Sequence, residues 1–590
     1  MTTLQKLFPD IVLGKLAAPA DHPGYLYDGF NPSTQTLPKG HTKAPGRRPF
    51  GVETVFERDV GIKLRDGVTI YTDIFRPATS NNEAGKVPAV IPWSPYGKTG
   101  RGPQNYDTMG PFRMGIPLDR TSGYEKFEAP DPAEWAERGY AIINVDARGA
   151  GDSEGDIVFW GQQEAEDIYD VVDWVYRQPW CNGSVAFAGN SWLAISQINF
   201  ASRFSHPAVK ALAPWEALTD VYRQNVIRGG VPRIKFVEMI LKGFAGHSRA
   251  ENFGEMYSKH PFHDDYWEDK TFKVENIKDV PMYLTASYST GIHSEGSFHT
   301  FMKAQTKQKW LRVHASQEWH DIYRDEINDE LQQFYDHYCK GIDNGWKDTP
   351  RFRLSLLGFN GSPAKTIVER PEETWPIPRT KEVKYYLDST QKKLSTSPLQ
   401  DEASASYEAH SLTDTVDFTF KFEKYTELAG YPVVKVWMSC KEKDDMDVHV
   451  QIRKVSRDGR PLKYLNYPCP IPEEEVADTN VAKFLGPDGM LRASSSCTNE
   501  YRDGRPFYTL TRSEPIPAGT VVPLEIPIWP IGMVFEEGES VMLRIAGHDL
   551  RLPEVERLRP TEPIDENIGR HVVHTGGRYD SHVILPVISQ

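Results

Sequence analysis

The first half of the chain repeats short apolar runs that are separated by amphipathic or glycine-rich stretches. The apolar runs of strand length occupy residues 87–93, 140–145, 185–188, 209–216, 280–286 and 309–313. Between two of these runs, the apolar residues of 164–177 recur at i, i+3, i+4 and i+7, which predicts a helix with one buried face. Near-continuous apolar strands that alternate with helices are typical of a parallel sheet. The pattern therefore predicts a doubly wound α/β domain.

From residue 351 onward the pattern changes to alternating apolar and polar positions, with Pro- and Gly-rich turns between the segments. The alternating segments are 351–357, 383–387, 431–438, 446–452, 540–545 and 581–587. A period of two is typical of half-buried strands, so this part is expected to be an all-β sandwich of the jelly-roll type.

Two stretches fall outside both patterns. Residues 222–279 mix polar and charged residues and are expected to be a cap inserted into the α/β domain. Residues 1–50 contain many Pro and Gly residues and are expected to form an irregular arm over the surface. The predicted domains are thus 1–350, with the cap at about 222–279, and 351–590.

Composition narrows the classes of protein to consider. The chain has 590 residues, 39% of them hydrophobic, which is enough for packed cores. A formal net charge of -14 argues against a nucleic-acid partner and against an anionic membrane surface. No apolar run approaches the ~20 residues that span a bilayer. Five scattered cysteines without a C-x-x-C pair favour reduced thiols in a cytoplasmic protein.

One junction between a strand and a helix carries candidate chemistry. Residues 185–188 lead into Gly189-Asn-Ser191, and a helical pattern begins at Leu193. A strand that turns sharply into a helix at a serine is the nucleophile elbow of α/β-hydrolases, and a glycine two residues earlier relieves the crowded turn. The usual G-x-S-x-G motif has glycine where this chain has Leu193. The match is therefore partial, and a serine that caps an ordinary turn is the alternative.

Further segments extend this likeness over most of the chain. They are the hairpin around Asp66-Gly67, Ser94-Pro-Tyr-Gly-Lys98, Asp146-Ala-Arg-Gly-Ala-Gly-Asp-Ser153, Asp220-Val-Tyr-Arg223 and Ser581-His-Val-Ile-Leu-Pro586. Together with the elbow, they resemble the cocaine-esterase-like (CocE/NonD) hydrolases, relatives of the Xaa-Pro dipeptidyl peptidases and the α-amino-acid ester hydrolases. The resemblance implies an α/β-hydrolase domain with a helical cap and a C-terminal jelly roll. It also implies serine hydrolysis of esters or amides without a cofactor.

The resemblance assigns the nucleophile and the oxyanion hole to particular residues. Ser191 becomes the nucleophile. The oxyanion that forms on attack would meet the Trp192 N–H and the hydroxyl of Tyr96, which lies in the Ser94-Pro-Tyr segment. A phenol stays neutral at pH 7 and can donate a hydrogen bond. The alternative for Tyr96 is a buried core tyrosine.

The acid and base do not follow the family pattern. The family's acid comes after the strand that matches residues 280–286, where this chain reads Ser287-Tyr-Ser-Thr-Gly291 without a carboxylate. The family's base comes after the strand that ends at residue 313. Glu216 ends the strand expected beside the nucleophile strand, and His314 directly follows residue 313. The hypothesis is therefore a Ser191–His314–Glu216 triad.

Both of these roles have more than one candidate. His320 and His293 could also act as the base, and Glu295 and Glu318 could also act as the acid. Glu216 could instead pair with Arg223.

We expect a soluble serine hydrolase that cleaves a small-molecule ester or amide through an acyl-enzyme. Neither a nucleic-acid nor a membrane partner is expected, and the oligomeric state stays open. No metal is expected, since the histidines of His260-Pro-Phe-His263 fit a polar cap loop. An acyltransferase that uses the same acyl-enzyme and a catalytically decayed binding protein are the two rivals. An aminopeptidase would need a carboxylate for the substrate ammonium group, and none can be assigned.

Overall fold

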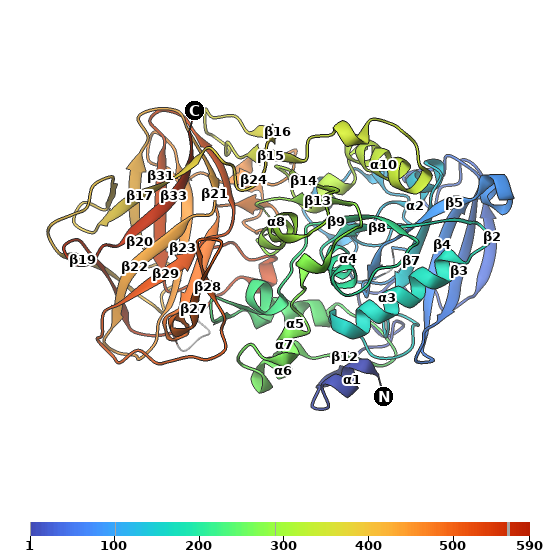
Figure 1. Ribbon diagram of the computed structural model, residues 1–590, viewed down its shortest axis with the longest axis horizontal. Helices are drawn as coiled ribbons and strands as arrows, with labels where there is room; N and C mark the ends of the chain where they lie inside the picture. Colours follow the sequence, from blue (N-terminus) through green and yellow to red (C-terminus); the bar gives the residue numbers. More distant parts are fainter. Residues whose placement is uncertain (1, 101, 290, 563–566, 590) are drawn as a thin grey trace.

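Two large sheets dominate the computed structural model, which describes residues 2–100, 102–289, 291–562 and 567–589 (Figure 1). The core of the first sheet is parallel. Its strands, in spatial order, are β15 (Phe352–Leu356), β14 (Lys309–Val313), β13 (Met282–Ala286), β9 (Val209–Trp215), β8 (Cys181–Asn190), β5 (Val87–Ile91) and β7 (Ala141–Asp146). The apolar runs of the sequence are thus the core strands of one α/β sheet, as predicted.

Antiparallel strands complete both edges of this sheet. Beyond β7 lie β4 (Thr69–Pro77), β3 (Thr54–Lys63) and β2 (Ser33–Leu37); beyond β15 lies β16 (Ile367–Glu372). The segment 351–357 was expected in the sandwich, but its strand β15 pairs in parallel with β14. Its alternating pattern does not reveal this placement, because β15 is buried at every position except Arg353, so its polar position Ser355 is covered as well.

Helices cover the first sheet as its sequence pattern requires. The stripe of α3 (Gly161–Tyr176) buries Ile168, Val171, Val172 and Val175. The helix that follows the elbow, α4 (Trp192–Arg203), packs beside α3 and against β8 and β9. The last helix of this part, α10 (Asp325–Lys340), also contacts β8 and β9.

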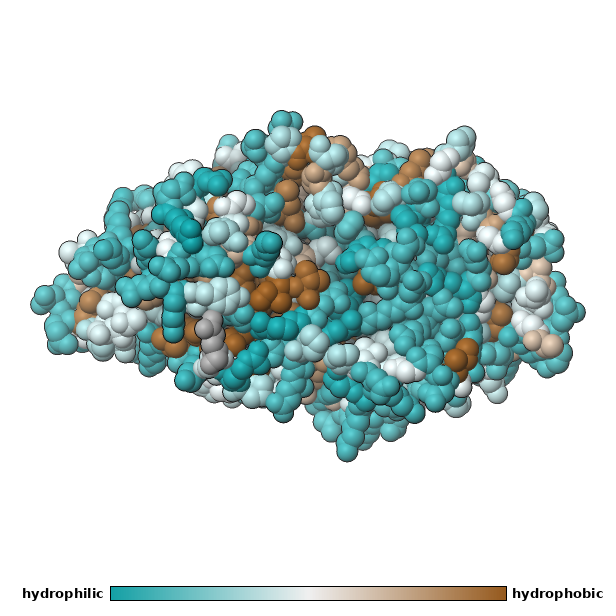
Figure 2. Space-filling model, turned by 90° about the horizontal axis from the view of Figure 1, so that it is seen from above, coloured by the Kyte–Doolittle hydropathy of each residue, from teal (hydrophilic) through white to brown (hydrophobic). Residues whose placement is uncertain are grey.

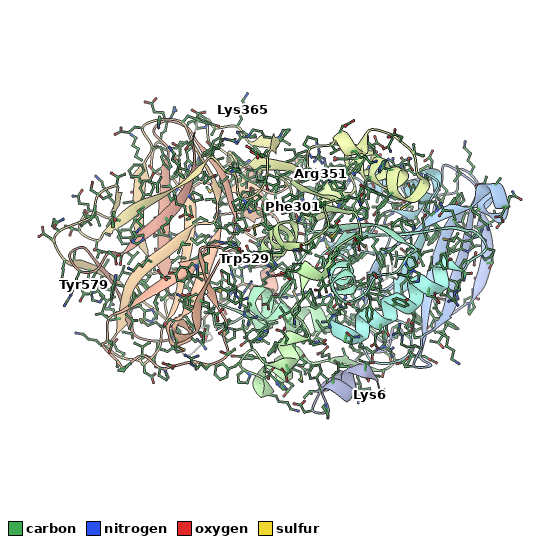
Figure 3. The ribbon with its side chains drawn as sticks, in the orientation of Figure 1. Lys6, Phe301, Arg351, Lys365, Trp529 and Tyr579 are labelled. Atoms are coloured by element: carbon green, nitrogen blue, oxygen red, sulfur yellow. The ribbon has the colours of Figure 1, made fainter. Side chains whose placement is uncertain are left out.

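The second sheet system forms the largely β C-terminal part, drawn in orange and red in Figure 1. It includes β17 (Thr380–Asp388), β22 (Val433–Cys440), β23 (Asp447–Val455), β31 (Ser540–Ala546) and β33 (His582–Ile588). Their pairings with one another are antiparallel. Trp529 lies where this part meets the α/β part, and the Arg228 guanidinium stands 4.0 Å from its ring centroid (Figure 3). The predicted all-β C-terminal part is confirmed.

The cap and the N-terminal arm interact. The segment expected to form the cap contains α5 (Ile234–Lys242), α6 (Phe253–Lys259) and α7 (Asp265–Glu268), which lie in the lower half of Figure 1. In the arm, β1 (Leu13–Lys15) pairs with β12 (Arg249–Glu251) of the cap. The arm was expected to be irregular, but β1 and the edge strand β2 form part of it. Both strands depend on distant partners, which local composition does not reveal.

Hydrophilic side chains cover most of the face in Figure 2, and hydrophobic ones gather there only in small patches. Within the described residues, no helix is both long enough and apolar enough to cross a membrane.

Candidate active site

The strand-to-helix junction of β8 and α4 has the geometry of a nucleophile elbow. Ser191 adopts φ 54° and ψ −121°, a strained conformation for a residue with a side chain. Gly189 precedes it with φ +122°, and a Cβ at that position would lie 2.5 Å from Leu193 Cδ2 and 2.7 Å from the Glu128 carbonyl oxygen. The glycine is therefore required. Leu193 is fully buried at the position where the usual motif has a second glycine.

Two carbonyl groups from distant segments hold the elbow. The Ser191 N–H donates to the Glu216 carbonyl at 3.1 Å, and the Asn190 N–H donates to the Glu128 carbonyl at 3.1 Å. Glu216 and Glu128 both have positive φ angles, of 64° and 66°. The backbone bonds that fix the elbow therefore also bring two buried carboxyl side chains next to it.

Two donors are placed where an oxyanion would form. Trp192 is the first residue of α4, so its backbone N–H has no acceptor within the helix. Its indole N–H is engaged by the Glu164 carboxyl at 2.8 Å. The Tyr96 hydroxyl lies within hydrogen-bonding reach of the Ser191 side chain. Burial, followed by the charge of Glu128, raises the pKa of Tyr96 well above its usual value, so the phenol stays a neutral donor.

Ser191 opens into a largely apolar pocket, which encloses about 440 Å³ of empty space. Polar groups enter it only from a few of its lining residues. These are Tyr96, Ser191, Asn225 and His293, together with the indole groups of Trp160 and Trp192. The remaining lining residues are aromatic or aliphatic: Phe159, Ile195, Leu218, Phe236, Val237, Ile240, Phe253 and Ile292. The nucleophile, the phenol and one histidine thus share one pocket.

That histidine, His293, comes from the loop after β13, where the family has its acid. Its side chain is buried, and Nδ1 lies 3.5 Å from Glu318 Oε2. Burial lowers the pKa of His293, although the carboxyl groups of Glu216 and Glu128 oppose this shift. The ring is therefore neutral near pH 7, as a general base must be.

His314 occupies a different place. Its Nε2 lies 2.9 Å from Glu216 Oε1, so the two predicted residues do meet. Its Nδ1 lies 3.4 Å from Ser316 Oγ and 3.9 Å from Asp321 Oδ1. Burial opposes charge on this ring, but Asp321 and Glu216 together raise the pKa of His314. Both ring nitrogens thus face groups other than Ser191.

His320, Glu295 and Arg223 each have partners away from Ser191. His320 Nδ1 is 2.9 Å from the Gly115 carbonyl oxygen. Glu295 is half-buried where the charges of Arg505 and Arg228 act on it. Arg223 pairs with Asp220 at 2.6 Å, so the suggested pairing of Arg223 with Glu216 is wrong.

A buried cluster of carboxyl groups lies behind the pocket. One ligand atom from each of Glu216, His293 and Glu318 lies within 4.8 Å of the others. Burial and the charge of Glu216 raise the pKa of Glu318 well above its usual value. Burial likewise raises the pKa of Glu128, and it raises that of Glu554 to about 7. The sequence analysis did not predict Glu128 or Glu554 at this cluster. A backbone turn brings Glu128 to it, and Glu554 comes from the C-terminal part.

Comparisons with known proteins agree with this geometry. Residues 66–243 match the X-Pro dipeptidyl-peptidase (S15) family, and residues 344–584 match the C-terminal non-catalytic domain of X-Pro dipeptidyl-peptidases. A solved CocE/NonD family hydrolase from Staphylococcus aureus superposes with a TM-score of 0.81. The two chains are 29% identical, and the match covers 91% of this chain and 94% of that one.

The chain is thus similar to the serine hydrolases of the CocE/NonD family over nearly its whole length. A Mycobacterium bovis protein named as a candidate serine esterase is 34% identical over 182 residues, which is 30% of this chain and 27% of that protein. The chain therefore aligns with only about a quarter of that relative's length. The cocaine esterase of a Rhodococcus species is 22% identical over 90% of this chain and 98% of its own. The chain departs from that family's usual acid position at Ser287-Tyr-Ser289, as its sequence indicated.

Proposed function

We propose that this hydrolase cleaves a small ester through an acyl-enzyme on Ser191, with His293 as the general base. The observation that carries the proposal is the shared pocket of Ser191, Tyr96, Trp192 and His293. The same groups could cleave an amide, but the departing amine depends more strongly than an alcohol on receiving a proton from the general acid.

In the first step, the Ser191 hydroxyl oxygen attacks the ester carbonyl, and its proton passes to Nε2 of His293. The oxyanion that forms is met by the Tyr96 hydroxyl and the Trp192 N–H. His293 then gives its proton to the departing alcohol oxygen, which leaves the acyl-enzyme. A water molecule reverses the sequence, with His293 again as base, and releases the acid and the free serine.

The carboxyl groups behind His293 have two roles in this proposal. Glu318 faces Nδ1 of His293 at 3.5 Å without a hydrogen bond between them, and it would orient the ring by closing this gap as the imidazolium forms. The charge of Glu216 favours the imidazolium that forms during attack. His314, held against Glu216 at 2.9 Å, fixes that carboxylate and is a positioning residue.

The pocket lining favours a substrate whose acyl group is apolar and uncharged. No Asp, Glu, Lys or Arg is among the described residues that line the pocket. An α-ammonium group would lose its hydration there without gaining a counter-charge, which is costly. We therefore favour a neutral ester over an aminopeptidase substrate.

The five cysteines are unpaired, which supports the reducing cytoplasmic location expected from their spacing.

Labelling with a fluorophosphonate tests the proposal, because only an activated serine reacts. We expect wild-type protein to be labelled on Ser191 and Ser191→Ala to remain unlabelled. The His293→Asn variant should react about 10²–10⁴-fold more slowly, the usual contribution of a general base. A smaller loss in His314→Asn is expected. The opposite ranking would support His314, the base predicted from sequence, and an unreactive wild-type protein would favour a decayed binding protein.

Acyl transfer remains the rival that labelling does not separate from hydrolysis. Adding a primary alcohol during turnover of an ester distinguishes them. Hydrolysis predicts free acid as the main product at all alcohol concentrations that leave the protein folded. Predominant formation of the new ester at low alcohol concentration would identify an acyltransferase.

A further inference from the structure

We propose that Glu216, His293 and Glu318 form a binding site for a divalent transition-metal ion such as Zn²⁺, and that the bound ion switches the hydrolase off. The binding rests on the geometry alone. The inhibition rests, in addition, on the proposed role of His293 as the base.

The spacing of the three side chains fits a compact ion. Their ligand atoms lie within 4.8 Å of one another, and His293 Nδ1 and Glu318 Oε2 are 3.5 Å apart. A tetrahedral Zn²⁺ site has bonds of about 2.0–2.1 Å, which separates its ligand atoms by about 3.4 Å. Small side-chain rotations of the two glutamates would close the remaining gap. The fourth position would be filled by water from the Ser191 pocket, which His293 lines.

The carboxyl oxygens are a second, independent observation in favour of a cation site. Oε2 of Glu216 and Oε2 of Glu318 are both buried without a hydrogen-bond partner. The two residues are 0% and 4% exposed, so bulk water does not solvate them. Buried carboxyl groups without partners are costly, and a dication between them removes that cost. Because a carboxylate has two oxygens, contact of Oε1 with His314 does not prevent Glu216 from binding an ion.

The donor set selects the kind of ion. One imidazole nitrogen and two carboxylate oxygens suit Zn²⁺, Mn²⁺ or Co²⁺. Mg²⁺ and Ca²⁺ prefer sites made of oxygen alone, and Mg²⁺ keeps several of its waters. This closed, buried site is therefore expected to prefer Zn²⁺ to Mg²⁺.

Inhibition follows from which nitrogen the ion takes. Coordination through Nδ1 needs that nitrogen unprotonated, so the single proton of the neutral ring moves to Nε2. A protonated Nε2 has no lone pair to accept the Ser191 proton, and Ser191 loses its base. The ion also occupies the carboxyl groups that favour the imidazolium.

Titration calorimetry on Ser191→Ala protein with ZnCl₂ tests the binding without turnover. We expect one tight site per chain and no comparable heat with MgCl₂. In the same background, Glu318→Gln and His293→Asn should weaken binding at least about 10–100-fold, the loss that even an outer-shell change causes. The matched control is His260→Gln, which removes a half-buried histidine of the cap segment that lies 2.6 Å from Asp264 and 3.0 Å from Asp10. That variant should bind Zn²⁺ as before.

Loss of binding only in His260→Gln, or no tight site at all, would overturn the proposal. If a pocket variant fails to fold, anomalous scattering at the zinc edge from wild-type crystals locates the ion directly. Density away from the three residues would then contradict the proposed site. Reversible inhibition of the wild-type esterase by Zn²⁺, relieved by EDTA, tests the consequence. If zinc binds at the site but the protein has no esterase activity, the proposed metal site stands and the proposed function is refuted.

Discussion

Replacing Tyr96 by phenylalanine removes one hydroxyl from the Ser191 pocket and leaves the ring in place. The ring is 5% exposed, and its centroid lies 5.6 Å from that of Phe127 and 6.0 Å from that of Trp192. Phenylalanine preserves these contacts, so folding stability should change little. Because burial raises the pKa of the Tyr96 phenol, the hydroxyl keeps its proton and can donate a hydrogen bond throughout the working pH range.

Loss of one oxyanion donor typically lowers kcat by about 10²–10³-fold, or about 2.7–4 kcal/mol of transition-state stabilisation. We expect Tyr96→Phe to show this loss with a nearly unchanged KM, because the bond is strongest in the transition state. Steady-state hydrolysis of a p-nitrophenyl ester measures both constants. The matched control is Tyr335→Phe, which removes a buried hydroxyl that donates to the Phe187 carbonyl at 2.6 Å. It should keep kcat. A Tyr96→Phe effect confined to KM, or an equal loss in both variants, would refute the assignment.

Three further changes have defined outcomes. Glu216→Gln keeps the size of the side chain and removes the charge that favours the His293 imidazolium, so kcat should fall, but by less than the about 10⁴-fold caused by loss of the tautomer-fixing acid in the serine-protease template; full activity would remove Glu216 from the site. Gly189→Ala places a Cβ 2.5 Å from Leu193 Cδ2, so its melting temperature should fall well below that of Gly40→Ala, whose Cβ meets nothing within 4 Å; equal melting temperatures would contradict the crowding argument. Burial lowers the pKa of His571 in the folded protein to about 4. The unfolded chain therefore binds this proton at higher pH than the folded chain does, and about 3 kcal/mol of the free energy of unfolding is lost as pH falls from 7 to below 4. His571→Gln should flatten that part of the stability curve measured by urea unfolding, and an unchanged slope would contradict it.

The sequence predicted those parts of the molecule that depend on local periodicity. Residues 185–188 formed the core of β8, and the apolar stripe of 164–177 became the buried face of α3. The elbow at Ser191 could also be predicted, because one turn contains its serine and the required glycine. These features need only neighbouring residues and the spacing of apolar side chains.

The partners of Ser191 could not be predicted in the same way. Their positions depend on loops after β13 and β14, whose paths no periodic pattern describes. The C-terminal part also holds the first of these loops, since the Arg551 guanidinium donates to the Gly291 carbonyl at 2.9 Å. Glu128 reaches the elbow because its own φ is positive, and a glutamate in the sequence gives no indication of such a backbone conformation. Long-range contacts of this kind become visible only in the folded chain.

The acyl-enzyme on Ser191 is the central claim, and quenched-flow mass spectrometry tests it most directly. Wild-type protein would be mixed with p-nitrophenyl butyrate, quenched in acid during turnover, digested and mapped. The account predicts a butyryl mass increment on the peptide that contains Ser191, formed as fast as the burst of p-nitrophenol. Turnover without any covalent adduct, or an adduct on another residue, would contradict it.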